Sequence, residues 1–180
     1  MLTRIDNALL DNLCAQAAAS PRRRKNHNLH TSDHALAHRL LNAVQPDSYI
    51  APHRHLDPAK DETFVVLRGL MGLIIFDNSG NIVEKIKVSA GDPKVVQGKQ
   101  SAGVADTANS AENIVLGADI PAGTWHTSFA LVPDTVILEA KAGPYHPLTN
   151  AERAPWAPAE NTPEAAAQLA SWQVLFKPNP

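Results

Sequence analysis

Two short segments of the chain carry residues suited to binding a metal ion. The first contains His53 and His55, and Asp61-Glu62 follow it. Because the side chains of a strand alternate between its two faces, both histidines would point to the same side and could reach one ion. The second segment, residues 120–126, is a Pro/Gly turn leading into a strand that begins with His126. Such a turn can place this histidine opposite the first strand.

The chemistry of these side chains indicates the kind of ion that they would hold. Neutral imidazole binds several first-row metals, and a carboxylate adds an anionic oxygen. Glu62 could supply that oxygen from the start of the next predicted strand, although Asp61 is adjacent and chemically equivalent. We therefore expect one divalent transition metal, which could be Zn, Fe, Mn or Ni. Structural zinc sites are usually closed and cysteine-rich, whereas three histidines and one carboxylate leave positions open for a ligand.

Basic and polar residues near the N-terminus are candidates for binding a substrate. In one hypothesis, Arg22 and Arg24 fold over the mouth of a β-barrel, which the strands after residue 46 are predicted to form, and hold phosphate or carboxylate through paired hydrogen bonds. Asn28 and His30 would share their face along an extended strand, and His30 could carry a proton. The alternative is a solvated basic surface. Tyr145 could contact the substrate and, like His30, carry a proton as a catalytic residue, or it could be a rim residue that packs the tail.

The periodicity of apolar residues predicts helices at both ends of the chain and strands between them. Residues 2–17 repeat apolar side chains every three or four positions, as an amphipathic helix does. Residues 31–33 resemble the N-cap of a second short helix, with its apolar face at Leu36, Leu40 and Val44. From residue 46 onward, short β-type runs separated by turns predict an antiparallel sandwich or barrel. Thr162 is expected to cap a last helix.

These elements divide the chain into three parts. Residues 1–45 are predicted to be a helical and basic arm, and residues 46–143 a barrel with a loop insertion at about 89–112. Residues 144–180 are predicted to be a Pro-rich tail whose helix packs on the barrel.

Composition and charge restrict the possible partners. The 180 residues include 44% hydrophobic and 19% charged residues, with a net charge of -2, which argues against nucleic-acid and membrane-surface partners. A single cysteine rules out an internal disulfide and favours a reducing compartment. Residues 1–20 do not resemble a signal peptide, and no run reaches the length of a membrane span. We expect a cytoplasmic protein that binds a small molecule.

The two histidine segments resemble the paired motifs of the cupin superfamily. Residues His53, His55, Glu62 and Gly69 match the first motif, and Pro121, Gly123 and His126 match the second. The resemblance implies a mainly β fold, a cupin jelly-roll β-barrel, here with short N-terminal and C-terminal helices. It also implies one metal on His53, His55, Glu62 and His126. Glu62 is favoured over Asp61 for its reach and for its spacing to Gly69.

A closer resemblance is to the WbuC-type cupin-fold metalloproteins. It covers most of residues 22–160 and includes the segments Asn26–His30, Ser48–His55, Lys60–Glu62, Leu67–Gly69, Gly143–Tyr145 and Ala154–Pro158. This family is associated with bacterial O-antigen and surface-polysaccharide gene clusters. The resemblance implies a role in polysaccharide biosynthesis, and the cupin fold implies a homodimer.

Two classes of function are consistent with these features. The first is a metal-dependent isomerase or epimerase that acts on a small anionic sugar derivative, such as a sugar phosphate or a nucleotide sugar. An iron-dependent oxygenase is a further enzyme hypothesis, because open metal positions also accept O₂. The second class is a non-catalytic, metal-dependent sugar-binding or regulatory protein.

Overall fold

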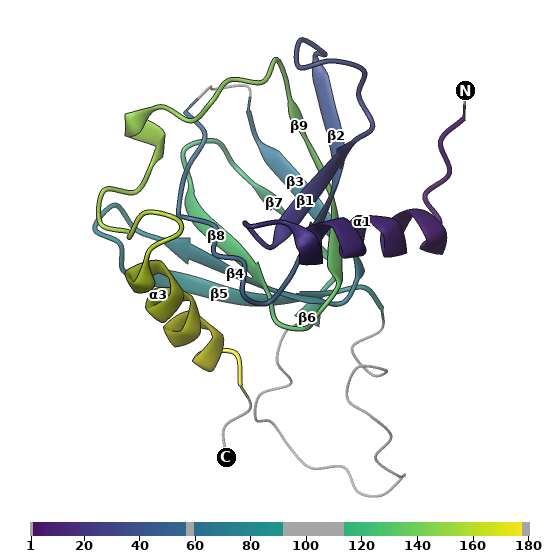
Figure 1. The fold of residues 1–180 in the computed structure, drawn as a ribbon. Helices are drawn as coiled ribbons and strands as arrows, with labels where there is room; N and C mark the ends of the chain where they lie inside the picture. Colours follow the sequence, from purple (N-terminus) through teal and green to yellow (C-terminus); the bar gives the residue numbers. More distant parts are fainter. Residues whose placement is uncertain (1, 57–59, 92–113, 178–180) are drawn as a thin grey trace, which may run out of the picture.

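The computed structural model describes residues 2–56, 60–91 and 114–177 (Figure 1). Nine strands and two α-helices are formed by these residues. In chain order they are α1 (Asn7–Ala19), β1 (Arg24–Asn28), β2 (Ala37–Val44), β3 (Glu62–Arg68), β4 (Leu70–Phe76), β5 (Ile82–Ser89), β6 (Ile114–Val115), β7 (Gly117–Ile120), β8 (Trp125–Ala130), β9 (Thr135–Ala142) and α3 (Pro163–Val174), with a 3₁₀ turn at Asn150–Glu152 before α3.

Two sheets make up the body of the protein. The larger has the strand order β1-β2-β9-β3-β7, and the smaller has the order β6-β5-β4-β8. Apart from the short parallel pair β5–β6, the paired strands are antiparallel. The non-consecutive neighbours β2–β9 and β4–β8 bring distant parts of the chain together, as in a jelly roll. The predicted fold class is confirmed in its architecture: the described residues form a mainly β, two-sheet jelly roll with short helices near both ends.

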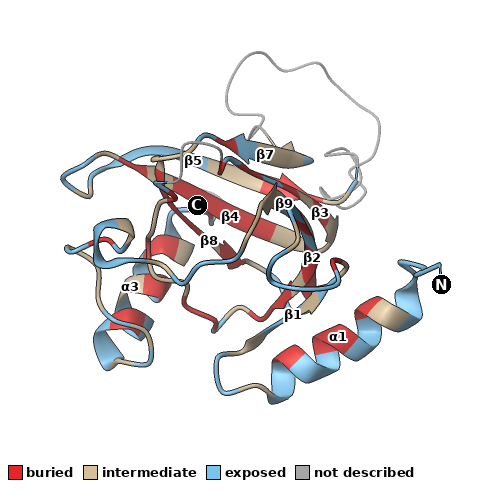
Figure 2. Cartoon of the chain, turned by 90° about the horizontal axis from the view of Figure 1, so that it is seen from above, coloured by how far each residue is buried: buried red, intermediate tan, exposed pale blue. Residues whose placement is uncertain are grey.

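Apolar side chains pack in three places around these sheets. Between the sheets, Phe64, Met71 and Val88 belong to a buried apolar cluster. On the outer face of the larger sheet lies α1, whose Leu13 packs against Val136. Outside the smaller sheet lies α3, on the side opposite to α1 (Figures 1 and 2). The two helices therefore cover outer faces, and the interior between the sheets holds this apolar cluster together with the polar residues described below.

The second helix predicted from residues 31–44 is wrong. Residues 37–44 form β2, which pairs with both β1 and β9. Both faces of β2 are buried, because Leu40 and Val44 point into the barrel while Leu41 and Ala43 pack against α1. A strand buried on both faces has a continuous apolar run, which periodicity alone does not distinguish from a helix.

The expected division of the chain can be set against this topology. Residues 24–44 contribute two strands to the larger sheet, so the boundary expected after residue 45 falls between strands of one sheet. Most of the insertion expected at about 89–112 lies outside the described residues. Within the described ranges, no helix combines the length and the apolar character of a membrane span.

Candidate metal centre

The segment that carries His53 is held between β8 and the tail. The backbone N–H of His53 donates to the carbonyl of His126 at 3.0 Å, and the N–H of His126 donates to the carbonyl of His53 at 2.9 Å. On its other side, His53 is also bridged to Arg153, and Ala154 donates to the carbonyl of Pro52 at 3.1 Å. Two histidines that are 73 positions apart are thus antiparallel partners.

Four side chains converge beside this bridge. Potential ligand atoms of His53, His55, Glu62 and His126 all lie within 4.8 Å of one another. Nε2 of His55 is 2.8 Å from Oε2 of Glu62. Glu62 begins β3, where it is paired with Ile120 of β7 and Lys141 of β9. The spacing of these atoms and the donor set, three imidazoles and one carboxylate, suit a first-row divalent metal.

Backbone carbonyls orient two of the imidazole rings. Nδ1 of His53 lies 3.0 Å from the carbonyl oxygen of Ala51, and Nδ1 of His126 lies 2.9 Å from that of Thr124. A carbonyl only accepts, so each Nδ1 carries the proton and each Nε2 keeps its lone pair. Metal-binding histidines are commonly held in this way.

Two buried nitrogens in the cluster have no hydrogen-bond partner among the described residues. They are Nε2 of His126 and Nδ1 of His55. Buried polar atoms without a partner are uncommon in folded proteins, and a bound ion can take the place of the missing partner. The residues of the cluster therefore fit a metal ion, both in donor type and in the atoms that are left without partners.

The ionisation states in the cluster also suit metal binding. Burial, followed by the proximity of His126, lowers the pKa of His53 from 6.5 to about 3. Burial also lowers the pKa of His126. Burial alone would raise the pKa of Glu62, but the hydrogen bond from His55 and the charge of Lys141 outweigh it and lower that pKa. Neutral imidazoles and an ionised carboxylate are the forms that bind metals.

Asp61, the alternative carboxylate, lies outside this cluster. Its Oδ1 accepts a hydrogen bond from the backbone N–H of Ala122 at 2.8 Å, and its side chain is exposed. This contact ties the start of β3 to the 121–124 turn, in which Gly123 has a φ of +81° that favours glycine. Asp61 therefore supports the turn before His126, whereas Glu62 joins the histidines.

One cavity is lined by residues of the cluster, and a second cavity adjoins it. The inner cavity has a volume of about 160 Å³ and is lined by His53, Glu62 and His126 together with apolar residues such as Phe64. The outer cavity has a volume of about 390 Å³, and its lining includes all five residues predicted to bind or convert a substrate: Arg22, Arg24, Asn28, His30 and Tyr145. Both cavities share four lining residues: Arg24, Asn42, Glu139 and Lys141.

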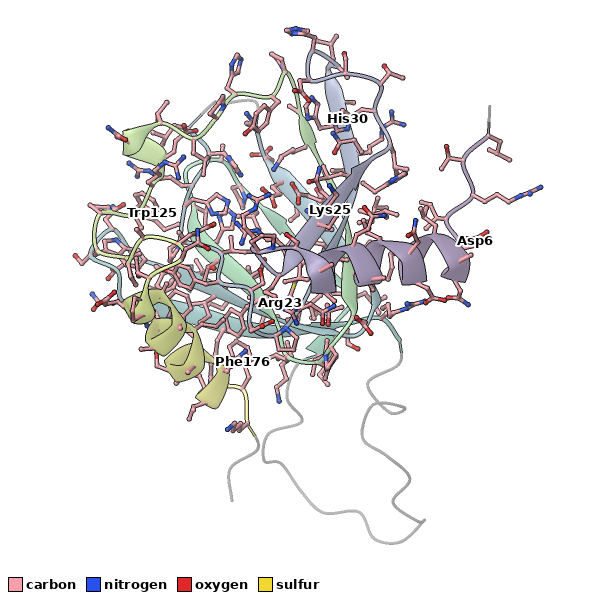
Figure 3. The ribbon with its side chains drawn as sticks, viewed as in Figure 1. Asp6, Arg23, Lys25, His30, Trp125 and Phe176 are labelled. Carbon is pink, nitrogen blue, oxygen red and sulfur yellow. The ribbon has the colours of Figure 1, made fainter. Side chains whose placement is uncertain are left out.

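The predicted substrate residues differ in how they are engaged. Arg24 donates to both carboxylate oxygens of Glu160, at 2.8 and 2.7 Å, so its charge is already paired. Arg22, Asn28 and Tyr145 are exposed at the outer cavity. His30 is buried and stacks on His38, with 4.0 Å between ring centroids. In Figure 3 it lies beside the upper end of β2, away from Trp125, the neighbour of His126.

Three residues at the junction of the cavities were not predicted from the sequence. Nζ of Lys141 is 2.5 Å from Oε1 of Glu139 and 3.6 Å from Oε2 of Glu62. Asn42 donates to Oε2 of Glu139 at 2.6 Å. A sequence signal was present, because Ile137, Glu139 and Lys141 alternate in a predicted strand and so share a face. Two charged residues on the face of a buried strand point to a functional interior.

The electrostatics of this junction couple its charged residues to Glu62. Burial opposes the charge of Lys141, but Glu62 and Glu139 outweigh it and raise the pKa of the ammonium. Burial and the neighbouring Glu62 raise the pKa of Glu139. Lys141 thus stays a cation between two acids, one of which belongs to the cluster.

Comparisons with known proteins found one family profile and several similar solved structures. A family profile, the domain of unknown function DUF6016, matches residues 5–88. No curated protein matches the chain. Among solved structures, KdgF from Halomonas sp. is similar at 16% identity and a TM-score of 0.46, over 71% of this chain and 84% of that one.

Two further similar structures are called cupins. A cupin superfamily protein from Desulfitobacterium hafniense has 13% identity and a TM-score of 0.45, over 72% of this chain and 86% of that one. A cupin-2 domain protein from Shewanella frigidimarina has 17% identity and a TM-score of 0.41, over 66% and 80%. The finer WbuC-type relationship stays a prediction, and what the chain does must be inferred from its own site.

Proposed function

We propose that this chain is a metal-dependent enzyme of the cupin type that acts as an isomerase or epimerase on a small anionic sugar derivative, such as a sugar phosphate or nucleotide sugar. One observation carries the proposal. The cluster of His53, His55, Glu62 and His126 lies at an inner cavity that adjoins a larger, polar outer cavity. A ligand in the outer cavity can therefore extend one end to the cluster.

The sizes of the cavities support a substrate of two parts. Small-molecule sites commonly have volumes of about 300–1,000 Å³. The outer cavity, at about 390 Å³, falls in this range, whereas the inner cavity, at about 160 Å³, is smaller. The reacting end would enter the inner cavity, and the remainder would stay near Arg22, Asn28 and Tyr145. The exposed guanidinium of Arg22 suits a phosphate there.

Ionisable groups close to the cluster favour an enzyme over a non-catalytic binding protein. A divalent metal held by the cluster supplies a Lewis acid for a carbonyl or hydroxyl oxygen. Isomerisation also needs a group that moves a proton. His30 lines the outer cavity, whereas Glu139 and Lys141 line both cavities, so these two lie nearer to the reacting end of a bound substrate.

The first test is metal binding by the purified protein. Elemental analysis, before and after reconstitution, should give about one equivalent of a transition metal in the wild type. His126→Ala should lose it, because one of the four donors is removed. Asp61→Asn is the matched control and should retain the metal, because Asp61 lies outside the cluster. Equal metal retention by the two variants would contradict the assignment of the site.

The second test is turnover. Sugar phosphates and nucleotide sugars would be incubated with metal-loaded wild type and with Glu62→Ala, and the products followed by NMR. Epimerisation or isomerisation by the wild type alone supports the enzyme. Binding without turnover across the panel would replace it with the non-catalytic sugar-binding function.

The biological setting is a further part of the proposal. The WbuC-type resemblance supports a role in surface-polysaccharide biosynthesis, and the cupin fold supports a homodimer. Light scattering coupled to size-exclusion chromatography would measure the oligomeric state directly.

A further inference from the structure

Lys141 lies between the two cavities and borders both. It is one of four residues that line both, together with Arg24, Asn42 and Glu139. Of the two cations in this set, Arg24 is held by both oxygens of Glu160 and by the carbonyl of Tyr49. Lys141 is therefore the cation whose ammonium lies beside the cluster, 3.6 Å from Oε2 of Glu62.

The charges around the inner cavity determine what it can accept. Arg24 and Glu160 neutralise each other, which leaves the carboxylates of Glu62 and Glu139 and the ammonium of Lys141. Histidines that bind a metal are neutral, so these three groups contribute one net negative charge to the loaded site. A divalent cation on the cluster would change this to one net positive charge, and a buried charge needs a partner of opposite sign.

We infer that Lys141 is a ligand-contacting residue that binds a singly charged oxygen group, such as a carboxylate, at the inner end of the ligand. This inference rests on the proposed function, because it requires a metal on the cluster. One negative charge neutralises the metal-loaded cavity, whereas a phosphate dianion would leave an excess of negative charge. A phosphate would therefore bind in the outer cavity.

Glu139 and Asn42 position this ammonium. Oε1 of Glu139 is 2.5 Å from Nζ, and the other carboxylate oxygen accepts from Asn42 at 2.6 Å. The three residues lie on the neighbouring strands β2 and β9, and Phe64 and Ile137 enclose the cavity beside them. These contacts hold the ammonium at the edge of the inner cavity.

Two small probes of similar shape test the inference. Lactate carries one negative charge, and lactamide carries none. Calorimetric titration of the zinc-loaded wild type should show tighter binding of lactate than of lactamide. Lys141→Met keeps most of the length of the side chain but removes its charge, so lactate affinity should fall about tenfold or more while lactamide affinity stays within about twofold. Lys85→Met, whose ammonium contacts Leu175 on the outside, should match the wild type.

A second variant predicts a change of opposite sign. Glu139→Gln removes one negative charge beside the cavity, so the preference for lactate over lactamide should increase. A fall in lactate affinity in both variants would assign Lys141 and Glu139 a structural role and overturn the inference. So would unchanged lactate binding in Lys141→Met. If Lys141→Met does not fold, the direction in which Glu139→Gln changes the preference for lactate over lactamide still tests the inference.

Zinc affinity, measured by competition with a chromophoric chelator, tests the metal centre separately from the role of Lys141. Wild type that binds no zinc would refute the metal centre itself. Wild type that binds zinc and prefers lactate, beside a Lys141→Met variant that binds zinc and has lost that preference, supports the role of Lys141.

Discussion

Acidification of the metal-free protein should lower its free energy of unfolding, because His53 is buried in its neutral form. Burial and the proximity of His126 lower the pKa of His53 from 6.5 to about 3. Between these two values the unfolded chain binds a proton that the folded protein does not. Stability therefore falls as the pH decreases from the unfolded pKa toward the folded one, and it is unaffected by His53 well above 6.5.

The size of this effect follows from the same two pKa values. A pH of 5 lies about 1.5 units below the pKa of the unfolded histidine, which is therefore protonated, whereas the folded histidine is still neutral. Each unit corresponds to about 1.36 kcal/mol, so His53 should lower the free energy of unfolding by about 2 kcal/mol between pH 7 and pH 5.

The assay is urea denaturation at both pH values with a chelator present. The wild type should lose about 2 kcal/mol more than His53→Gln over this interval, because glutamine does not titrate. The comparison subtracts the effect of the substitution at pH 7 and the contributions of other groups. His34→Gln, at an exposed position, is the control and should follow the wild type. Equal losses in wild type and His53→Gln would refute the reasoning.

Three further substitutions test the parts of the fold that hold the site. Phe129→Ala removes a fully buried ring that stacks near Trp172, so thermal or urea unfolding should show a loss of about 3–5 kcal/mol, and a loss below 1 kcal/mol would contradict the packing. Gly69→Ala should also lower the melting temperature clearly, because Gly69 has a φ of +83° and a Cβ there would lie 2.9 Å from the backbone of Thr135. An unchanged melting temperature would argue against this turn. Glu152 accepts hydrogen bonds from the N–H groups of Thr149 and Leu56, so Glu152→Gln should speed hydrogen exchange at the Leu56 amide, measured by NMR. Unchanged exchange would mean that this contact does not hold Leu56 in place.

The hydrogen bonds of Glu152 should also weaken in acid. The pKa of Glu152 is lowered to about 2. The hydrogen bond from the backbone of Thr149 is the largest cause, burial opposes the shift, and the hydrogen bond from Leu56 adds to it. Because the folded pKa lies below the ordinary value of 4.5, this stabilisation is present above pH 4.5 and is lost as the pH falls toward 2. Faster exchange at the Leu56 amide near pH 3 than the intrinsic pH dependence predicts would confirm it, and its absence would contradict it.

Local patterns in the sequence were sufficient for the elements that depend on near neighbours. The alternation of His53 and His55 puts both rings on one side, and their ring centroids are 5.2 Å apart. Thr162 caps α3 because its hydroxyl accepts from the N–H of Ala165 three positions on. The resemblance to the cupin motifs favours Glu62 over Asp61 through its spacing to Gly69, and Glu62 lies with the histidines. The alternation of the histidines and the cap at Thr162 follow from the periods of strands and helices, which need no knowledge of the rest of the chain.

Long-range pairing decided the remainder. The pairing of β3 with β9 places Lys141 opposite Glu62, and the pairing of β2 with β9 carries Asn42 to Glu139. Neither proximity is visible in a linear sequence, because sheet register depends on which strands become neighbours. Tertiary packing also explains why the helix predicted at residues 31–44 is wrong. Because α1 packs on the outer face of β2, this strand is apolar on both faces, and its sequence resembles that of a helix. The sequence by itself determined the ligand types and their local geometry, whereas tertiary structure determined which charges surround them.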